Sequence, residues 1–396
     1  MRLNDVQKID WQLLDDKIRK WICAAKISIR TLFAREKKLC AYVFEGFDDK
    51  TRDYCFAEIV KEPTDRLLAF AEAVAATSRT PERMFRVLDL YEVLTDLMPD
   101  IEDIYSQESC RSVHEQANKI QVQLSEASRG ILMEFEKAVK KEKSKVRIPG
   151  GTVHPLTRYV MNYLSFLSDY NESLVNIITD VPGKLAKALP DSELNDPSAP
   201  LSVHIGWTIF ILLCKLYKKC DLYKDVSLSY LFLMNNLHYV VQKVNGSQLK
   251  YILGMKWVRK EWNKVGQYAV KYERSALVKL LSCLTNEKVP ANGGALKERL
   301  QEFNSATEEV KTRHGGWVVP DVSLREKLRV SITEKLIPPY ASLVARLRSQ
   351  FESNSYIKYT PEEYNKSTGD NVLAVFSVKK LVSRANVSLP FTQNHV

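Results

Sequence analysis

The sequence predicts an all-α protein made of stacked antiparallel helical bundles. Apolar residues recur at steps of three and four along most of the chain, which is the spacing of one helix face. Only 14 glycines and 15 prolines occur in 396 residues, too few for a protein with many hairpin turns. The breaks between the helical stretches are short, and short connections join helices that lie antiparallel to each other.

The first predicted helix covers residues 9–38 and has one apolar face. That face is formed by Leu14, Ile18, Trp21, Ile22, Ile29 and Phe33. Prolines then follow at even intervals, at Pro63, Pro81 and Pro99. We expect each of these prolines near the start of a helix, where the missing N–H of proline costs little.

A long helix is predicted around residues 113–138, where one apolar stripe continues for seven turns. The stripe consists of Val113, Ala117, Ile120, Leu124, Ala127, Ile131, Phe135 and Ala138. A helix of about 30 residues is about 45 Å long, because each residue adds about 1.5 Å. This helix should therefore span a whole bundle.

Four breaks divide the remainder of the chain, at residues 140–151, 189–200, 289–294 and 313–321. The stretches between these breaks predict further long helices. Their ranges are 155–179, 201–219, 226–244, 255–284, 295–312 and 323–351. Pro338 and Pro339 should kink the last of them, because interior prolines remove helical hydrogen bonds.

Residues 148–170 place Gly150 and Gly151 directly before an apolar run, which raises the question of a phosphate-binding loop. Such a loop needs a lysine after the last glycine and a strand before the first. The sequence has neither feature at this position. We therefore interpret the segment as a hinge between bundles.

The residue types of most enzymes and metal sites do not occur here at the required spacing. The seven cysteines are scattered singly without a CxxC pair, which is typical of a reducing compartment. The six histidines never pair at metal-ligand spacing with each other or with cysteine. No HExxH, GxSxG or GxGxxG sequence is present. We expect a chain that is not an enzyme and needs no cofactor.

Neither a signal peptide nor a membrane span is predicted. Residues 1–10 are polar and charged, unlike the start of a secretory signal. The most apolar stretch, Ile205–Cys214, has ten residues, about half of the roughly 20 that span a bilayer. We expect a buried helix there, and a cytoplasmic protein that is a monomer when isolated.

Charge is distributed unevenly along the sequence. Residues 46–136 contain 10 basic and 19 acidic residues, whereas residues 201–396 contain 29 basic and 16 acidic residues. A basic half attracts nucleic acid, anionic lipid or an acidic protein. No nucleic-acid-binding motif occurs, and the acidic half would repel a duplex. Nucleic acid is therefore not an expected partner.

Two groups of basic residues are candidate contact surfaces. The central basic strip would lie on one face of the helix at 255–284 and consists of Lys256, Arg259, Lys260, Lys264, Lys271 and Arg274. The opposite, inward face would carry Val258, Trp262, Val265, Ala269, Ala276 and Leu280. The late basic cluster consists of Arg346, Arg348 and Lys358, beside Tyr356 and Tyr359. Either group could be an ordinary solvated face. Each basic residue near an anionic bilayer contributes about 1 kcal/mol, so a cluster could bind one reversibly.

Five segments in collinear order resemble the plant form of the seventy-kilodalton exocyst subunit. They are Phe33–Phe47, Leu97–Tyr105, Ile148–Tyr170, Tyr230–Ser247 and Trp317–Tyr340. The resemblance implies an elongated rod of helical bundles without enzymatic activity, tethering secretory vesicles to the plasma membrane. It implies contacts with other exocyst subunits, small GTPases and anionic lipids of the plasma membrane, phosphoinositides among them. Such a protein is cytoplasmic and associates peripherally with the plasma membrane and secretory vesicles. The alternative is a diverged paralogue that serves as an interaction platform in plant immunity, bound by pathogen effector proteins.

The resemblance also implies an organisation of the chain. A linking helix from an absent N-terminal region would occupy residues 1–45, followed by an acidic bundle at 46–148, a central bundle at 149–288, a C-terminal bundle at 289–360 and a divergent tail at 361–396. Near the end of the family sequence, two lysines of a Lys-Tyr-Ile-Lys-Tyr motif contact lipid. Here Lys358 matches the second lysine, but Ser355 stands at the first. The resemblance therefore implies weakened lipid binding.

Overall fold

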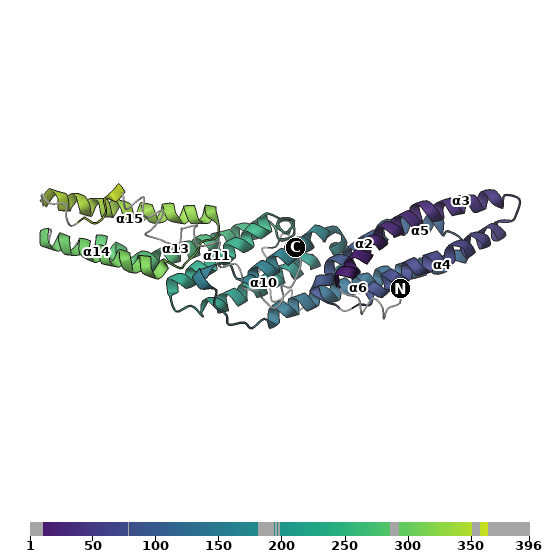
Figure 1. Cartoon of the computed structure of the whole chain (residues 1–396), viewed down its shortest axis with the longest axis horizontal. Coiled ribbons are helices and arrows are strands. Elements are labelled where there is room, and N and C mark those ends of the chain that lie inside the picture. Colours follow the sequence, from purple (N-terminus) through teal and green to yellow (C-terminus); the bar gives the residue numbers. More distant parts are fainter. Residues whose placement is uncertain are drawn as a thin grey trace. The chain divides into compact units, whose positions relative to one another are not determined.

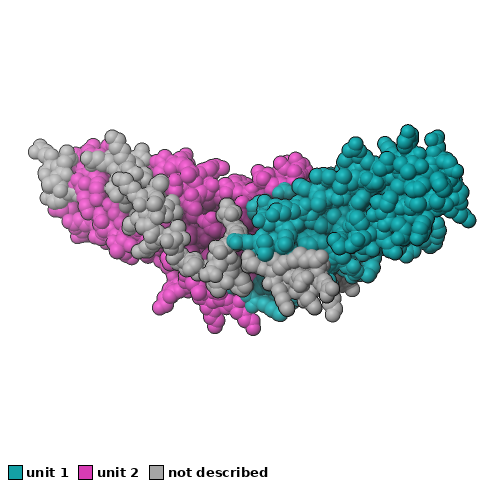
Figure 2. Space-filling model, turned by 45° about the vertical axis from the view of Figure 1, so that its right-hand side comes forward, with its two compact units in different colours: residues 1–142, 164–208 teal, residues 143–163, 209–396 magenta. Residues whose placement is uncertain are grey.

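The computed structural model describes residues 11–77, 79–180, 194, 196, 199–285, 293–350 and 357–362, and every regular element within them is a helix (Figure 1). The predicted all-α class is thereby confirmed. The chain forms two compact units (Figure 2). Unit 1 comprises residues 1–142 and 164–208, and unit 2 comprises residues 143–163 and 209–396. The finer division into bundles at 46–148, 149–288 and 289–360 stays a prediction.

Unit 1 begins with helical chain that continues from residue 11 to residue 43. Helix α2 (Trp11–Ile27) passes through a π-helical stretch (Ser28–Phe33) into α3 (Ala34–Val43). The predicted apolar face is buried except for Ile22, which is half-buried. The Trp21 indole N–H donates to the carbonyl of Leu67 at 2.8 Å, which links α2 to helix α4 (Asp49–Ala75).

The prolines of unit 1 correct one prediction. Pro81 does begin a 3₁₀ turn, Pro81–Arg83, but Pro63 lies inside α4 (Asp49–Ala75) and Pro99 inside α5 (Met84–Ile104). Both interior prolines are exposed. Each removes the hydrogen bond to the carbonyl four residues earlier, and on the solvent side water can satisfy that carbonyl. The buried faces of α4 and α5 then hold each helix together across its proline.

The long helix of unit 1, α6 (Arg111–Lys141), buries the predicted stripe from Val113 to Phe135 against α4 and α5. At the end of the stripe Val139 is buried while Ala138 is exposed. Helix α8 (Asn171–Ile177) closes the unit against α5 and α6. The Tyr170 hydroxyl, just before α8, donates to Asp89 Oδ1 at 2.7 Å.

Unit 2 contains the predicted long helices of the second half of the chain. These are α11 (Val226–Asn245), α13 (Met255–Thr285), α14 (Gly293–His314) and α15 (Val322–Gln350). The short α12 (Leu249–Leu253), between α11 and α13, was not predicted. Helices α7 (Pro155–Leu167) and α10 (Pro200–Cys220) each contribute residues to both units. Helices α11 and α13 form the most extensive helix pair. Pro338 and Pro339 lie inside the continuous α15.

Among the described residues, α10 is one helix long and apolar enough to cross a membrane by length and composition. Of its apolar window, 67% is buried within the protein. Core helices pass the same test, and burial on this scale is typical of them. We therefore interpret α10 as a core helix.

Residues 149–154 are bound tightly within unit 2, so this segment is not itself a hinge. Gly150 and Gly151 have φ angles of 70° and 67°, which non-glycine residues rarely adopt. The Gly150 carbonyl accepts the Val318 N–H at 2.9 Å, and the Gly151 carbonyl accepts from Asn235 Nδ2 at 2.8 Å.

The neighbouring Asn236 completes this attachment from the same helix, α11. Its Oδ1 accepts the His154 N–H at 2.8 Å and the Thr157 hydroxyl at 2.7 Å. Its Nδ2 donates to the carbonyls of Thr152 and Phe232 at 3.3 and 2.7 Å. The first turn of α7 is thus tied to the middle of α11 by one buried amide.

Candidate functional site

The described residues contain no group of three or more His, Cys, Asp or Glu side chains that could hold a metal ion. The candidate sites that the sequence predicts are the two basic surfaces, and both belong to unit 2. The central basic strip lies on α13. The late basic cluster lies on α15 and on the segment 357–362, which contacts α14.

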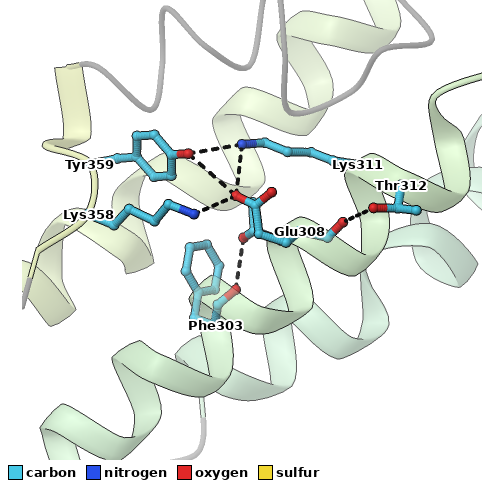
Figure 3. A network of polar contacts seen from close by, with 7 residues as sticks. Phe303, Glu308, Lys311, Thr312, Lys358 and Tyr359 are labelled. Atoms are coloured by element: carbon cyan, nitrogen blue, oxygen red, sulfur yellow. Dashed lines mark hydrogen bonds and ion pairs between the residues drawn. The ribbon is translucent and has the colours of Figure 1, made fainter.

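In the late basic cluster, the two arginines and the lysine differ in their ion pairs. Arg346 and Arg348 lie exposed near the end of α15. Neither makes an ion pair with a residue in the part of the chain that the structure describes. Lys358 lies on the segment 357–362, and its Nζ is 2.9 Å from Glu308 Oε1 of α14 (Figure 3). Sequence reasoning missed this acidic partner.

Glu308 is the centre of a small polar network (Figure 3). Its Oε1 also lies 3.3 Å from Lys311 Nζ and accepts the Tyr359 hydroxyl at 3.4 Å. Lys311 Nζ in turn donates to the Tyr359 hydroxyl at 3.2 Å. The ammonium groups of Lys311 and Lys358 lie 4.8 and 5.5 Å from the centre of the Tyr359 ring. Lys311 and Lys358 therefore share one carboxylate oxygen as ion-pair partner and one aromatic ring as cation–π partner.

This network changes the proton affinity of its members in the expected directions. The hydrogen bond from Lys358 lowers the pKa of the Glu308 carboxyl, and Lys311 adds to the effect. The hydrogen bond to Glu308 raises the pKa of Lys358. Lys358 therefore stays charged at neutral pH, but that charge is already paired within the protein.

The segment 357–362 is held on α14 and α15 by a second set of contacts. The Tyr340 hydroxyl of α15 donates to the Tyr359 carbonyl at 2.7 Å. The Tyr340 ring stacks on Phe303 of α14 with ring centres 4.9 Å apart, and both rings are buried. Lys358 therefore has a fixed backbone position beside Glu308. Ser355, where the family motif has a lysine, lies outside the described residues.

The central basic strip lies on α13, as predicted, but its members differ in their surroundings. Lys256, Arg259, Lys260, Lys271 and Arg274 are exposed, and Lys264 is half-buried. Lys264 Nζ is 2.6 Å from Glu261 Oε1. Lys271 Nζ lies over the rings of Tyr268 and Tyr230, 4.9 and 6.0 Å from their centres. Lys264 and Lys271 are therefore bound within the fold.

The inward face of α13 corrects part of the prediction. Val258, Val265, Ala276 and Leu280 are buried as expected. Trp262, by contrast, is 41% exposed and lies beside the His238 ring, 5.4 Å between ring centres, and Ala269 is half-buried. Helix α13 packs mainly on α11, and its buried side includes Glu261, Tyr272 and Glu273. The sequence pattern did not indicate that these three residues are buried.

Comparison with known proteins places these features in a family. The family model for the C-terminal region of the Exo70 exocyst complex subunit matches residues 19–366. Exocyst complex component EXO70B1 of Arabidopsis thaliana is 38% identical over 371 residues, which cover 92% of this chain and 58% of that protein. Exocyst complex component EXO70A1 of the same plant is 35% identical over 384 residues, with the same coverage of both chains.

Solved structures agree at the level of the fold. The crystal structure of the S. cerevisiae exocyst component Exo70p matches with a TM-score of 0.53 and 18% identity, over 89% of this chain and 71% of that one. A second structure of S. cerevisiae Exo70 gives a TM-score of 0.52 and 17% identity, over 89% of this chain and 70% of that one. The chain spans less than two thirds of the length of the Arabidopsis relatives named above.

Proposed function

The chain belongs to the Exo70 family of exocyst complex subunits, in its plant-type form, and from this membership we propose that it acts in tethering secretory vesicles to the plasma membrane. The observation that carries the proposal is the match of residues 19–366 to the family's C-terminal region, on a chain folded as helical bundles. In this role the chain works by binding and needs no catalysis. Its expected partners are other exocyst subunits, small GTPases and anionic lipids.

Assembly with the other exocyst subunits is the direct test of this function. The tagged chain should recover those subunits from plant extract, whereas an unrelated helical-bundle protein of similar charge should not. If the subunits are absent but other proteins are recovered specifically, the chain serves the alternative role of an interaction platform in immunity. The last 30 residues support this alternative, because the family match ends at residue 366.

Lipid contact is the second part of the proposal, and the late basic cluster is its site. Arg346 and Arg348 are exposed at the end of α15, and Lys358 lies on the anchored segment that follows. A lipid phosphate at Lys358 would replace the Glu308 carboxylate as its partner. Basic side chains near an anionic bilayer add roughly 1 kcal/mol each, screened within about 8 Å at physiological salt. Binding should therefore be weak and sensitive to salt.

Liposome flotation with phosphoinositide vesicles tests this contact. Lys358→Glu should weaken binding, because it places a second carboxylate beside Glu308. Ser355→Lys should strengthen binding, because it restores the charge of the family motif. Binding that persists unchanged in high salt, or that neither substitution alters, would show that the late basic cluster is not a lipid site.

A further inference from the structure

Helix α13 carries an exposed apolar face in its first half. With 3.6 residues per turn, Met255, Trp262, Gly266 and Val270 fall within an arc of about 80° on one side of the helix. Trp262 is 41% exposed, Met255 50% and Val270 42%. Gly266 is also exposed, and an added Cβ there would meet nothing within 4 Å. These four residues form the Trp262 face, which extends over about 22 Å of helix.

Trp262 is held in place by neighbours from two other helices. The buried His238 ring of α11 lies 5.4 Å from it, measured between ring centres. The Lys327 ammonium group of α15 lies over the indole, 5.6 Å from the ring centre. Trp262 is therefore on the side of α13 that is turned toward α15, as is Glu273, which pairs with Lys335 of α15. A side chain that is already ordered loses little entropy when a partner covers it.

Positive charge borders the Trp262 face. Four exposed cations lie around it and form no ion pair with a described residue: Lys256, Arg259, Arg274 and Lys327. Arg259 lies within the arc of the face, where its methylene groups can cover apolar surface while its guanidinium stays in water. The two acidic residues of α13, Glu261 and Glu273, are buried at 4% exposure each. The helix therefore exposes no carboxylate that would neutralise this border.

Two further cations of α13 lie away from the Trp262 face. Lys260 and Lys271 are exposed, but they are turned by about 160° and 180° from Trp262 around the helix axis. Lys271 lies over the rings of Tyr268 and Tyr230. These two lysines therefore belong to the opposite side of the helix.

We infer that the Trp262 face is a docking surface for an amphipathic helix of a partner protein, with apolar side chains along its centre and acidic side chains along its edges. An exposed, ordered tryptophan with smaller apolar neighbours and a charged border has the composition of a protein-interface centre. The open position at Gly266 lets a second helix approach α13 closely, to the about 8–10 Å between axes at which helices pack. Because the border is positive, electrostatic complementarity selects an acidic partner.

A helix fits this geometry better than a flat surface does. The Trp262 indole lies under the Lys327 ammonium group, so its apolar surface is at the junction of α13 with α15. A helix can lie along such a junction, whereas a planar surface contacts the outermost side chains. The inference uses only α11, α13 and α15, so it does not depend on the tethering role.

The test uses the whole chain labelled with fluorotryptophan and a synthetic helical peptide of about 20 residues, or about 30 Å. The peptide has leucine along one face and glutamate on both flanks. The six tryptophans provide six fluorine resonances, and Trp262→Phe identifies the resonance of Trp262. The peptide should shift this resonance and leave that of Trp21, in unit 1, unchanged. A peptide of the same composition in shuffled order, and one with lysine in place of glutamate, should leave both unchanged.

Substitutions in the Trp262 face should weaken binding of the acidic peptide, measured by fluorescence anisotropy. Trp262→Ala should weaken it about 30-fold, a loss typical of an interface hot spot. Gly266→Leu should abolish it, because the leucine fills the space that the partner helix needs. Gly46→Leu, at an exposed glycine of unit 1 with equally open surroundings, is the matched control and should bind normally. Circular dichroism should show equal helical content in all four proteins.

The inference is overturned if the shuffled acidic peptide binds equally well, because charge alone would then account for the contact. It is also overturned if the Trp262 resonance does not move, or if Gly266→Leu binds as tightly as the unmodified chain. A shift of that resonance by phosphatidylserine vesicles, but not by the helical peptide, would assign the face to lipid and not to a helix.

Discussion

Gly150 is a residue at which even the small change to alanine should destabilise the fold. Its φ of 70° disfavours any other residue, and an added Cβ would lie 2.5 Å from the Gly316 carbonyl oxygen. Gly150→Ala should therefore destabilise the chain by roughly 2–4 kcal/mol. Urea denaturation followed by circular dichroism would measure the change.

Gly266 provides the matched control for this substitution. It lies on the exposed face of α13, and an added Cβ would meet nothing within 4 Å. Gly266→Ala should raise stability by roughly 0.5–1 kcal/mol, because alanine loses less backbone entropy in a helix. Equal effects of the two alanines would contradict the conformation described for residues 149–151.

His314 should make the stability of unit 2 depend on pH. It is fully buried and stacks on Trp317 with ring centres 3.8 Å apart. Burial, helped by the charge of Arg313, lowers its pKa to about 3. The unfolded chain then binds a proton that the folded chain does not, at any pH between about 6.5 and 3. Stability should fall as pH falls through that window, by up to about 2 kcal/mol at pH 5.

The urea midpoint at pH 7 and at pH 5 measures this loss. His314→Phe should make the two midpoints more similar, since a ring without nitrogen cannot take up a proton in either state. Part of the loss should remain, because burial also lowers the pKa of His238, against the opposing effect of Asp321. An unchanged difference between the midpoints in His314→Phe would exclude His314 as the cause.

At the scale of elements, Asn236 joins α11 to residues 152–157, at the start of α7, through three hydrogen bonds. Asn236→Ala would leave the N–H of His154 and the hydroxyl of Thr157 without their acceptor in a buried place. The expected loss is roughly 2–5 kcal/mol. Hydrogen exchange should show faster opening at residues 152–158. The control Tyr239→Phe removes one partly buried bond to Asn162 and should cost about 1 kcal/mol.

Glu308 should weaken the attachment of the late basic cluster to lipid, because its carboxylate already pairs with Lys358, which a lipid phosphate would need. Glu308→Gln removes this competing charge and should strengthen binding to phosphoinositide vesicles several-fold. The neighbouring Glu309, which pairs with Lys279 of α13, is the matched control. Glu309→Gln should have a smaller effect on binding at the late basic cluster. A Glu308→Gln protein that binds no better would remove Glu308 from the account of this site.

The helices could be predicted from sequence because their periodicity is local. The predicted range 226–244 differs from α11 by one residue, and 323–351 differs from α15 by one residue at each end. The prediction that Pro63 and Pro99 lie near helix starts is wrong. A helix tolerates an interior proline on the side that faces water, where water can bind the carbonyl that loses its hydrogen bond. That side is decided by the neighbouring helices, not by the residues around the proline.

The candidate site could be predicted in its residue types but not in its pairing. The basic face of α13 followed from spacing, whereas the burial of Glu261 and Glu273 depends on the contact between α13 and α11. The pairing of Lys358 with Glu308 joins residues 50 positions apart. No local pattern indicates such a contact, so the sequence alone left Lys358 as a free charge.

For the whole molecule, the contrast of charge predicts how the chain behaves in solution. Residues 46–136 have a net charge of −9, and residues 201–396 have a net charge of +13. Opposite regions on separate molecules attract each other when salt is low, and this attraction is screened within about 8 Å at physiological salt. Sedimentation should show a monomer at physiological salt and reversible association at low salt. Association that increases with salt would point to an apolar contact instead.

The attachment of residues 149–154 also bears on how the chain is made. Gly151 and Val318, which both accept hydrogen bonds from Asn235, are 167 positions apart in the sequence. During synthesis at about 5–20 residues per second, roughly 10–30 s pass between the appearance of the two. Asn235 of α11 appears 83 positions before Val318, so it waits for this partner through about half of that interval, roughly 4–17 s. Newly made chains should therefore depend on chaperones that shield apolar surface until the ribosome has passed residue 318.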